Sequence, residues 1–594
     1  MAVRTAIPSF PVTLSCKGGT KLTRSLRLDR NVPMAMRDGV VLRADICRPD
    51  DARRHPAILF RTPYNKVFAN SSGYLSIVEA AFAGYAVVVQ DIRGRFASDG
   101  EWRRENMFTV EGPDGYDSVE WIASQRWCDG NVGMAGASYL AGLQWAAAME
   151  SPPHLKAIAP WMGIWGAGMK PPPSGGAILL VPAVTAIPAT AMEVADRLER
   201  EGQDVSELRR LLNWASANPE EILNFLPLKD IPFTRFDSIR ELWQMRLHSP
   251  PPAETARRER FGNVVTPCYY VCGWFDMLEW ASFAACKRMQ EEGGTERARQ
   301  GQHILVGPWM HGQPRDFLGG LNFGRAAAAR QGQIGEHNLA FFERYLRDRD
   351  VEIPAVRYFV MGRNRWQTAS QWPLPQTQWQ RFYLHSKGGA NTAAGDGVLS
   401  RDEPVSEPPD TFVYDPHHPV PSTGGRMVGF GLVPGPLDQS RVERRQDVLC
   451  YTTTVLKENV EVTGPLKLHL FAATSAVDTD FTAKLVDVHP DGRAFNVVEG
   501  IIRASGRRLD GGRNPVIPGK VYEYTIHMGE TSQFFPRGHC IRIEISSSNF
   551  PTFDRNMNTG NPIGEDAVGV PATQTVYHRQ GCASYIDLPV IPEQ

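Results

Sequence analysis

Three residues from distant parts of the chain could together perform nucleophilic catalysis: Ser138, Asp276 and His311. A serine hydroxyl is a weak nucleophile at neutral pH and needs a base in hydrogen-bond contact. Histidine suits that role because its pKa lies near neutrality, and a carboxylate fixes its tautomer and stabilises the imidazolium. The order serine, acid, histidine is the order found in α/β-hydrolases. The pattern therefore predicts a hydrolase that works through an acyl-enzyme intermediate.

Ser138 lies between a hydrophobic run and a helix of small residues, in the segment Gly136-Ala137-Ser138-Tyr139. This is typical of a nucleophile elbow, in which a short strand turns sharply into a helix and exposes a strained serine. Small neighbours such as Gly136 and Ala137 fit beside such a turn. We expect a strand over 132–135 and a helix over 140–149. The backbone N–H of Tyr139 is then one expected oxyanion donor.

The acid and the histidine each follow a predicted strand. Asp276 comes after the run 267–271, and His311 comes after the run 303–306. Active sites of open α/β sheets form at the carboxyl ends of the strands. An aspartate after a strand is more often a cap or turn residue, and a loop histidine is more often solvated, so the prediction depends on their joint order. His303 begins its strand and is therefore expected at the wrong end of the sheet.

A second oxyanion donor should come from a loop after an early strand. Tyr64, in Arg61-Thr62-Pro63-Tyr64, follows the predicted strand 56–60 and could present its phenol there, although a packing role is the alternative. The segment from Gln90 to Gly100 also follows a strand. Its arginines are balanced by acids, which favours an internal ion-pair network over a phosphate-binding loop.

The first 165 residues alternate between predicted strands and helices, which indicates a parallel sheet covered on both faces. Besides those above, we expect a strand over 85–90 and a helix over 114–123. The proline-rich stretch Met169 to Thr190 suits a loop that enters an inserted unit. Residues 191–225 and 235–247 then look helical and amphipathic. Such an insertion usually covers the substrate, and a packing module without ligand contact is the alternative.

Strand composition dominates after about residue 380. The strands are expected over 448–455, 466–472, 481–488 and 521–528, with a long surface connection over 388–423. This indicates a β-sandwich of the jelly-roll type. The predicted fold is thus an α/β-hydrolase core (1–165 and 258–378), a helical cap (166–257) and a jelly-roll domain (379–594).

Composition limits the partners. Lys and Arg number 64 and Asp and Glu number 65, for a net charge of -1, which offers no general attraction for nucleic acid or an anionic membrane. No apolar run approaches the roughly 20 residues of a membrane span, and Met1 to Ser15 lack a secretion signal. Nine scattered cysteines then suggest a reducing cytoplasm. Cys268 and Cys272 could share a zinc ion, but buried structural thiols are favoured.

Five motifs together resemble the family of cocaine esterase and the X-prolyl dipeptidyl-peptidases. They are Gly136-Ala137-Ser138-Tyr139, Gly273-Trp274-Phe275-Asp276, Gly307-Pro308-Trp309-Met310-His311, Asp91-Ile92-Arg93-Gly94 and Arg61-Thr62-Pro63-Tyr64. The resemblance covers nearly the whole chain and includes Gly435-Pro436-Leu437-Asp438 and the run from Asp478 to Val488. It implies the triad Ser138, Asp276 and His311, with Tyr64 and the Tyr139 N–H holding the oxyanion. It implies no metal and no organic cofactor.

The chain departs from the family pattern at a few places. Ala141 stands where the family often has glycine, which should tighten helix packing and spare the chemistry. Met277 follows the acid, and together with Phe275, Trp161 and Trp165 it is a candidate for the substrate pocket. The two tryptophans could stack against an aromatic acyl or alcohol group of the substrate, or they could serve packing alone. The extra N-terminal helical domain of the large X-prolyl peptidases is missing, which weakens the exopeptidase reading.

The predicted function is hydrolysis of a small carboxylic ester or amide. One alternative is an X-Pro dipeptidyl-peptidase, which needs a carboxylate cluster to bind a substrate ammonium, supplied by Glu279 or another acid. Another is an α-amino-acid ester hydrolase or acylase. A more remote alternative is a carbohydrate- or partner-binding protein built on an inactive hydrolase scaffold. A homo-oligomer is compatible with the sequence, which does not specify the oligomeric state.

Overall fold

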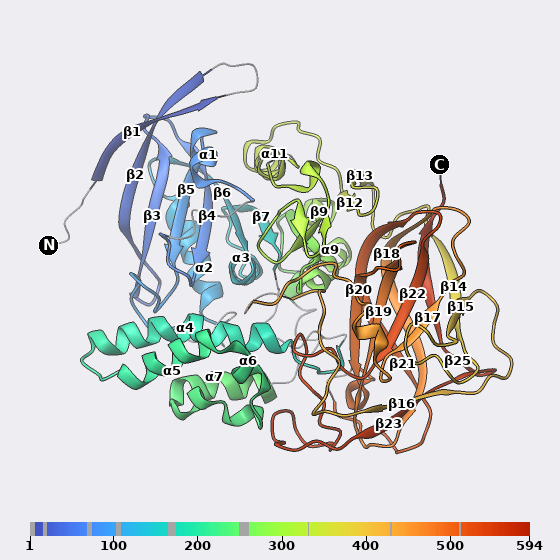
Figure 1. Cartoon of the computed structure of the whole chain (residues 1–594). Helices are drawn as coiled ribbons and strands as arrows, with labels where there is room; N and C mark the ends of the chain where they lie inside the picture. Colours follow the sequence, from blue (N-terminus) through green and yellow to red (C-terminus); the bar gives the residue numbers. More distant parts are fainter. Residues whose placement is uncertain are drawn as a thin grey trace.

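The structure is a computed structural model that describes residues 6–15, 21–67, 74–102, 109–163, 174–248, 260–330, 332–427, 431–509 and 512–593. The chain forms a sheet with helices around it, a layer of helices beneath, and a β domain beside them (Figure 1). These parts match the predicted fold class.

The hydrolase sheet has eleven described strands in the order β1-β2-β3-β5-β4-β6-β7-β8-β9-β12-β13. The seven strands from β5 to β12 run parallel. Their bounds are β4 His55–Thr62, β5 Ala86–Asp91, β6 Cys128–Ala137, β7 Leu155–Trp161, β8 Cys268–Phe275, β9 Gln302–Met310 and β12 Val356–Val360. Every residue of β4, β5, β8 and β9 is buried, as expected for parallel strands covered on both faces.

Antiparallel strands, which the sequence did not predict, extend the predicted parallel sheet at its edges. Three antiparallel strands, β1 (Ala6–Ser15), β2 (Lys21–Ala35) and β3 (Val41–Pro49), extend one side, and β13 (Arg365–Ala369) closes the other. Charged residues alternate with apolar ones in β2, so this edge has no continuous apolar run to reveal it.

Helices cover both faces of the sheet (Figure 1). The main ones are α1 Ile77–Phe82, α2 Glu111–Ala123, α3 Tyr139–Met149, α9 Glu279–Glu292 and α11 Ile334–Arg347. Successive residues of one strand enter different apolar clusters: Met134 belongs to one and Ala135 to the other. The sheet is therefore a rigid platform with a core on each side.

The inserted helices are α4 (Leu180–Arg200), α5 (Ser206–Ala217), α6 (Pro219–Asn224) and α7 (Asp237–His248). The predicted loop from Met169 to Thr190 is wrong in its second half, because α4 already begins at Leu180 and includes Pro188. The inserted helices form a separate apolar cluster that includes Val184, Ile187 and Trp243. This packing stabilises α4 despite the proline.

The β domain is mostly antiparallel, in the order β16-β23-β18-β26-β14-β15-β17-β22-β19-β20, with β21 paired to β18. Its strands are β14 Gln378–His385, β15 Val398–Ser400, β16 Asp410–Tyr414, β17 Leu449–Thr452, β18 Val460–Thr474, β19 Asp480–Val488, β20 Ala494–Arg503, β21 Tyr522–Phe535, β22 Cys540–Ser546, β23 Ala572–Val576 and β26 Tyr585–Ile591. The predicted connection over 388–423 is wrong in part, because it contains β15 and β16.

Candidate active site

The predicted catalytic residues follow the ends of neighbouring parallel strands. Ser138 comes directly after β6, Asp276 after β8 and His311 after β9, and β7 lies between β6 and β8. Because the carboxyl ends of parallel strands meet at one edge, these side chains start from the same edge of the sheet. The residue that follows β7 is Met162.

Ser138 has the backbone geometry of a nucleophile elbow. Its φ is 60° and its ψ is -119°, a left-handed conformation that costs a non-glycine residue about 1–3 kcal/mol. Its N–H donates to the carbonyl of Trp161 at 3.0 Å, which fixes the turn. Gly136 has a φ of +142°, and a Cβ there would lie 2.6 Å from Leu140 Cβ. Only glycine permits this close approach of strand and helix.

His311 and Asp276 form a direct pair. His311 Nδ1 lies 2.9 Å from Asp276 Oδ1, and the same oxygen accepts the Leu278 N–H at 2.9 Å. The Asp276 side chain is fully buried. Burial alone would lower the pKa of His311, but the charge and hydrogen bond of Asp276 outweigh it, so the pKa is raised above its ordinary value. This is the effect needed to stabilise an imidazolium formed during catalysis.

Met162 links the serine side of the site to the histidine side. Its thioether accepts the Gly312 N–H at 2.9 Å and the Tyr74 hydroxyl at 2.8 Å. Its own N–H donates to the carbonyl of Val271 in β8 at 2.6 Å. The sequence analysis missed Met162, because it did not predict the strand β7 that ends just before this residue.

The two candidate oxyanion donors lie side by side. Tyr139 is the first residue of α3, where backbone N–H groups and the helix dipole favour negative charge. Tyr64 lies just beyond β4, and its side chain is 50% exposed. The two rings meet in a T-shaped arrangement, with centroids 6.4 Å apart and an angle of 74° between their planes. Tyr64 thus extends from the loop next to the elbow with its ring accessible.

Buried ion pairs brace the loops at this edge, as the balanced charges predicted. Asp91 accepts from Lys66 Nζ at 3.0 Å and from the Lys66 N–H at 2.7 Å. Arg95 pairs with Glu193 of α4 at 2.8 Å, and its Nε donates to the carbonyl of Pro63 at 3.0 Å. Arg95 therefore joins the inserted helices to the loop that bears Tyr64.

The candidate pocket residues have different environments. Trp161 is fully buried, packs against Phe60 and Tyr74, and donates its indole N–H to Asn338 at 2.8 Å. It is therefore a core residue, which was the open alternative. Trp165 lies outside the described residues. The remaining two are both buried: Phe275 is the last residue of β8, and Met277 lines a cavity toward the β domain.

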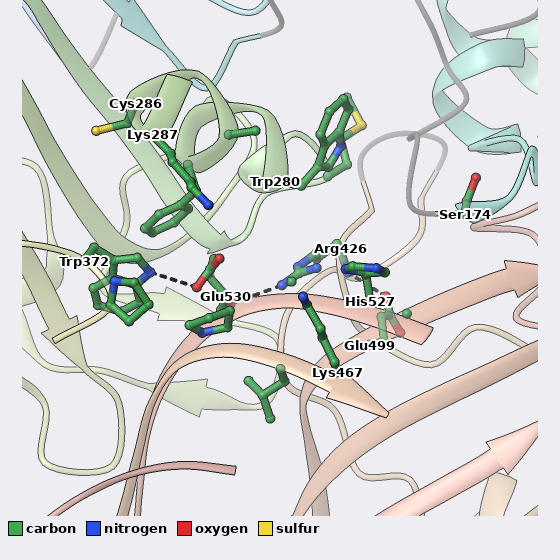
Figure 2. Close-up of a pocket in the computed structure, with 18 of the residues that line it drawn as sticks. Ser174, Trp280, Cys286, Lys287, Trp372, Arg426, Lys467, Glu499, His527 and Glu530 are labelled. Carbon is green, nitrogen blue, oxygen red and sulfur yellow. Dashed lines mark hydrogen bonds between the residues drawn. The ribbon is translucent and has the colours of Figure 1, made fainter. Parts of the chain in front are cut away.

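Glu279 is held by the β domain. Its Oε1 accepts the Glu530 N–H at 2.9 Å, and its Oε2 lies 3.2 Å from Arg426 Nη2. Arg426 also donates to the carbonyls of Trp274, Met528 and Glu530. Figure 2 shows Arg426 and Glu530 on the wall of the cavity between the sheet and the β domain. The fully buried Glu279 carboxylate is thus engaged within the protein.

Possible metal ligands lie away from the strand ends. Cys268 and Cys272 are buried free thiols within β8, and burial raises the pKa of Cys268 to about 12. In the β domain, Asp487, His489 and His539 place one ligand atom each within 4.8 Å of the others. There Asp487 Oδ1 lies 2.7 Å from His539 Nδ1, so these two side chains form a hydrogen bond with each other without a metal.

None of the described helices is long and apolar enough to cross a membrane.

Comparison with known proteins places the chain in a family. The model of the X-Pro dipeptidyl-peptidase (S15 family) matches residues 38–313, and that of the X-Pro dipeptidyl-peptidase C-terminal non-catalytic domain matches residues 351–587. Cocaine esterase of Rhodococcus sp. (strain MB1 Bresler) is 38% identical over 582 residues, which cover 94% of this chain and 98% of that protein. The chain belongs to this family of serine hydrolases. The predicted family, fold class and ester-hydrolase activity are thereby confirmed.

Solved structures agree on the architecture. An α-amino acid ester hydrolase has a TM-score of 0.76 at 24% identity, covering 95% of this chain and 96% of that one. An aminopeptidase from a Thaumarchaeota archaeon has a TM-score of 0.75 at 23% identity, covering 98% and 96%. At these identities the likeness concerns the fold alone.

Proposed function

We propose that this serine hydrolase cleaves carboxylic esters with Ser138 as nucleophile, His311 as general base and Asp276 as the residue that orients the histidine. The supporting observation is the 2.9 Å contact of His311 Nδ1 with Asp276 Oδ1, at the strand edge that also bears the strained Ser138. This contact leaves His311 Nε2 as the nitrogen that takes the serine proton.

The reaction proceeds in two steps. Ser138 Oγ attacks the ester carbonyl while His311 takes its proton, and the imidazolium then protonates the leaving alcohol. The Tyr139 N–H and the Tyr64 hydroxyl stabilise the oxyanion. Water, activated by His311, then attacks the acyl-enzyme and releases the acid. No step needs a metal or an organic cofactor.

The substrate we propose is an ester without a required α-ammonium group, as the name of cocaine esterase suggests for that relative. Exopeptidases and α-amino-acid ester hydrolases need an available carboxylate for the substrate ammonium. The carboxylate of Glu279 is instead occupied by Arg426 and the Glu530 N–H. This contact favours ester cleavage over removal of X-Pro dipeptides.

A labelling and turnover experiment tests the proposal. We expect a fluorophosphonate probe to label wild-type protein at Ser138 and to leave Ser138→Ala unlabelled. A simple aryl ester should be turned over much faster than an X-Pro anilide. Wild-type turnover by folded Ser138→Ala protein would exclude the serine mechanism. Preferential cleavage of the anilide would support the dipeptidyl-peptidase alternative.

A further inference from the structure

The cavity between the hydrolase sheet and the β domain begins at Met277, next to Asp276, and extends away from the proposed triad. Its volume is about 390 Å³, within the range of small-molecule sites. Its walls come from α9, from the sheet, and from β18, β20 and β21 of the β domain. Ser138, Asp276 and His311 are not among the described residues that line it.

One wall of this cavity is aromatic. Phe283 and Trp372 lie with ring centroids 5.3 Å apart, and Trp280 also lines the cavity. The indole N–H of Trp280 is buried within the protein and does not face the open space of the cavity. The flat apolar wall fits a ring or a short hydrocarbon body.

Two lysines reach into the cavity from different parts of the chain. Figure 2 shows Lys287 of α9 and Lys467 of β18 extending toward its centre. The Lys287 side chain is exposed and lies 3.9 Å from Glu291, at the far limit of an ion pair. Lys467 is also exposed and has no ion pair within the described part of the chain. The register of β18 with β21 shifts between Leu466 and Lys467. Such bulges redirect a side chain and occur often beside functional sites.

The acids at the cavity are already satisfied. Glu530 accepts the Trp372 indole N–H at 2.8 Å, and burial and the neighbouring Glu279 raise the pKa of Glu530 to about 8. Glu499 accepts the Arg426 N–H at 3.0 Å and the Asn549 amide at 3.1 Å. At neutral pH the cavity therefore presents more positive than negative charge to an occupant.

We propose that this cavity binds an organic monocarboxylate, with its carboxylate at Lys287 and Lys467 and its apolar body against Phe283 and Trp372. An organic ammonium of the same shape would meet two like charges and is excluded. The site makes no use of Ser138, so it is independent of the proposed catalytic mechanism.

Isothermal titration of the full-length protein tests this site with 4-phenylbutyrate and 4-phenylbutylamine, which share one apolar body. We expect the carboxylate to bind and the amine not to bind. Lys467→Met should weaken carboxylate binding by about tenfold or more, since a charge-assisted hydrogen bond is lost. Lys457→Met, which removes an exposed lysine of the β domain outside the cavity, should leave binding unchanged.

A cavity-filling variant locates the site. Ala284 lines the cavity, and Ala284→Phe should abolish carboxylate binding while the protein keeps its unfolding temperature. If Ala284→Phe proves unstable, Lys467→Met decides the matter because Lys467 is exposed and its loss does not disturb the core. Equal affinity of wild-type protein and Lys467→Met, or tighter binding of the amine, would overturn the proposal.

Discussion

A Cβ on Gly163 would lie 2.0 Å from the Cβ of Ala141, at the point where α3 passes the residues after β7. Ordinary carbon contacts are about 3.5–4.0 Å, so Gly163→Ala should push α3, and Ser138 with it, out of position. We expect a loss of about 1–3 kcal/mol in unfolding free energy, together with reduced esterase activity. Urea denaturation and ester turnover measure both effects.

A second substitution makes this prediction specific. Ala141→Gly removes the clashing methyl, so the double variant should be more stable than the sum of the single changes by roughly 1 kcal/mol or more. Ala141→Gly alone costs about 1 kcal/mol of helix stability. If the changes in unfolding free energy of the two substitutions are strictly additive, the side chains at 141 and 163 do not clash.

Ser138 offers a test that separates strain from chemistry. Both Ser138→Ala and Ser138→Gly should lower kcat by a factor on the order of 10⁴ to 10⁶. Because the φ of this residue is 60°, glycine adopts the conformation without strain and alanine does not. We therefore expect the glycine variant to exceed the alanine variant in stability by about 1 kcal/mol. Thermal unfolding of the two inactive proteins provides the comparison, and equal stabilities would contradict a strained elbow.

The pH dependence of kcat/KM should follow His311. The base must be neutral, so activity falls as pH drops through its pKa, which Asp276 raises above the ordinary value of 6.5. Asp276→Asn removes the charge that raises this pKa, so the acid limb should move to lower pH. Its kcat should fall by a factor of about 10⁴. An unchanged acid limb in this variant would assign the titration to another group.

Tyr64→Phe should lower kcat by about 10 to 1000-fold with little change in KM, because the phenol acts on the oxyanion and not on the bound ester. Tyr64 is half exposed, so the substitution should leave stability unchanged. Steady-state kinetics on an aryl ester give the result. A variant that changes only KM would make Tyr64 a binding residue.

Glu530 should make stability depend on pH. Its pKa is raised from 4.5 to about 8 in the folded protein, so the folded state holds a proton that the unfolded chain releases between those values. Its contribution to stability is therefore fully present below about pH 4.5 and is lost as pH rises through 8. Glu530→Gln keeps an acceptor for the Trp372 N–H and does not ionise. At pH 8.5 it should unfold at higher urea concentration than wild type, by about 1 kcal/mol; at pH 5 the difference should disappear.

Much of the hydrolase core could be predicted because its central strands are buried on both faces and read as continuous apolar runs. The order of Ser138, Asp276 and His311 along these runs was sufficient to predict their shared edge. The edge strands β1 to β3 were not predicted because polar, charged or proline residues interrupt their apolar residues. The start of α4 was not predicted because its prolines are typical of a loop. Packing of its apolar face against the other inserted helices nevertheless stabilises the helix.

The features of the site that were not predicted depend on contacts between segments that are far apart in the sequence. Met162 has no motif of its own, and its contacts with Tyr74 and Gly312 exist only after the strands are side by side. The pairing of Glu279 with Arg426 joins the hydrolase half to the β domain, and no local pattern reveals it. Local sequence therefore left Glu279 open as a binder of substrate ammonium.

Arg426 touches the turn after β8 from both sides, through the Trp274 carbonyl before Asp276 and the Glu279 carboxylate after it. A shortened enzyme that ends before the β domain would lack this guanidinium and leave Glu279 buried without its counter-charge. Chimeras that exchange the β domain between relatives must therefore keep Arg426 and Glu279 together. The β domain helps to shape the turn that carries Asp276.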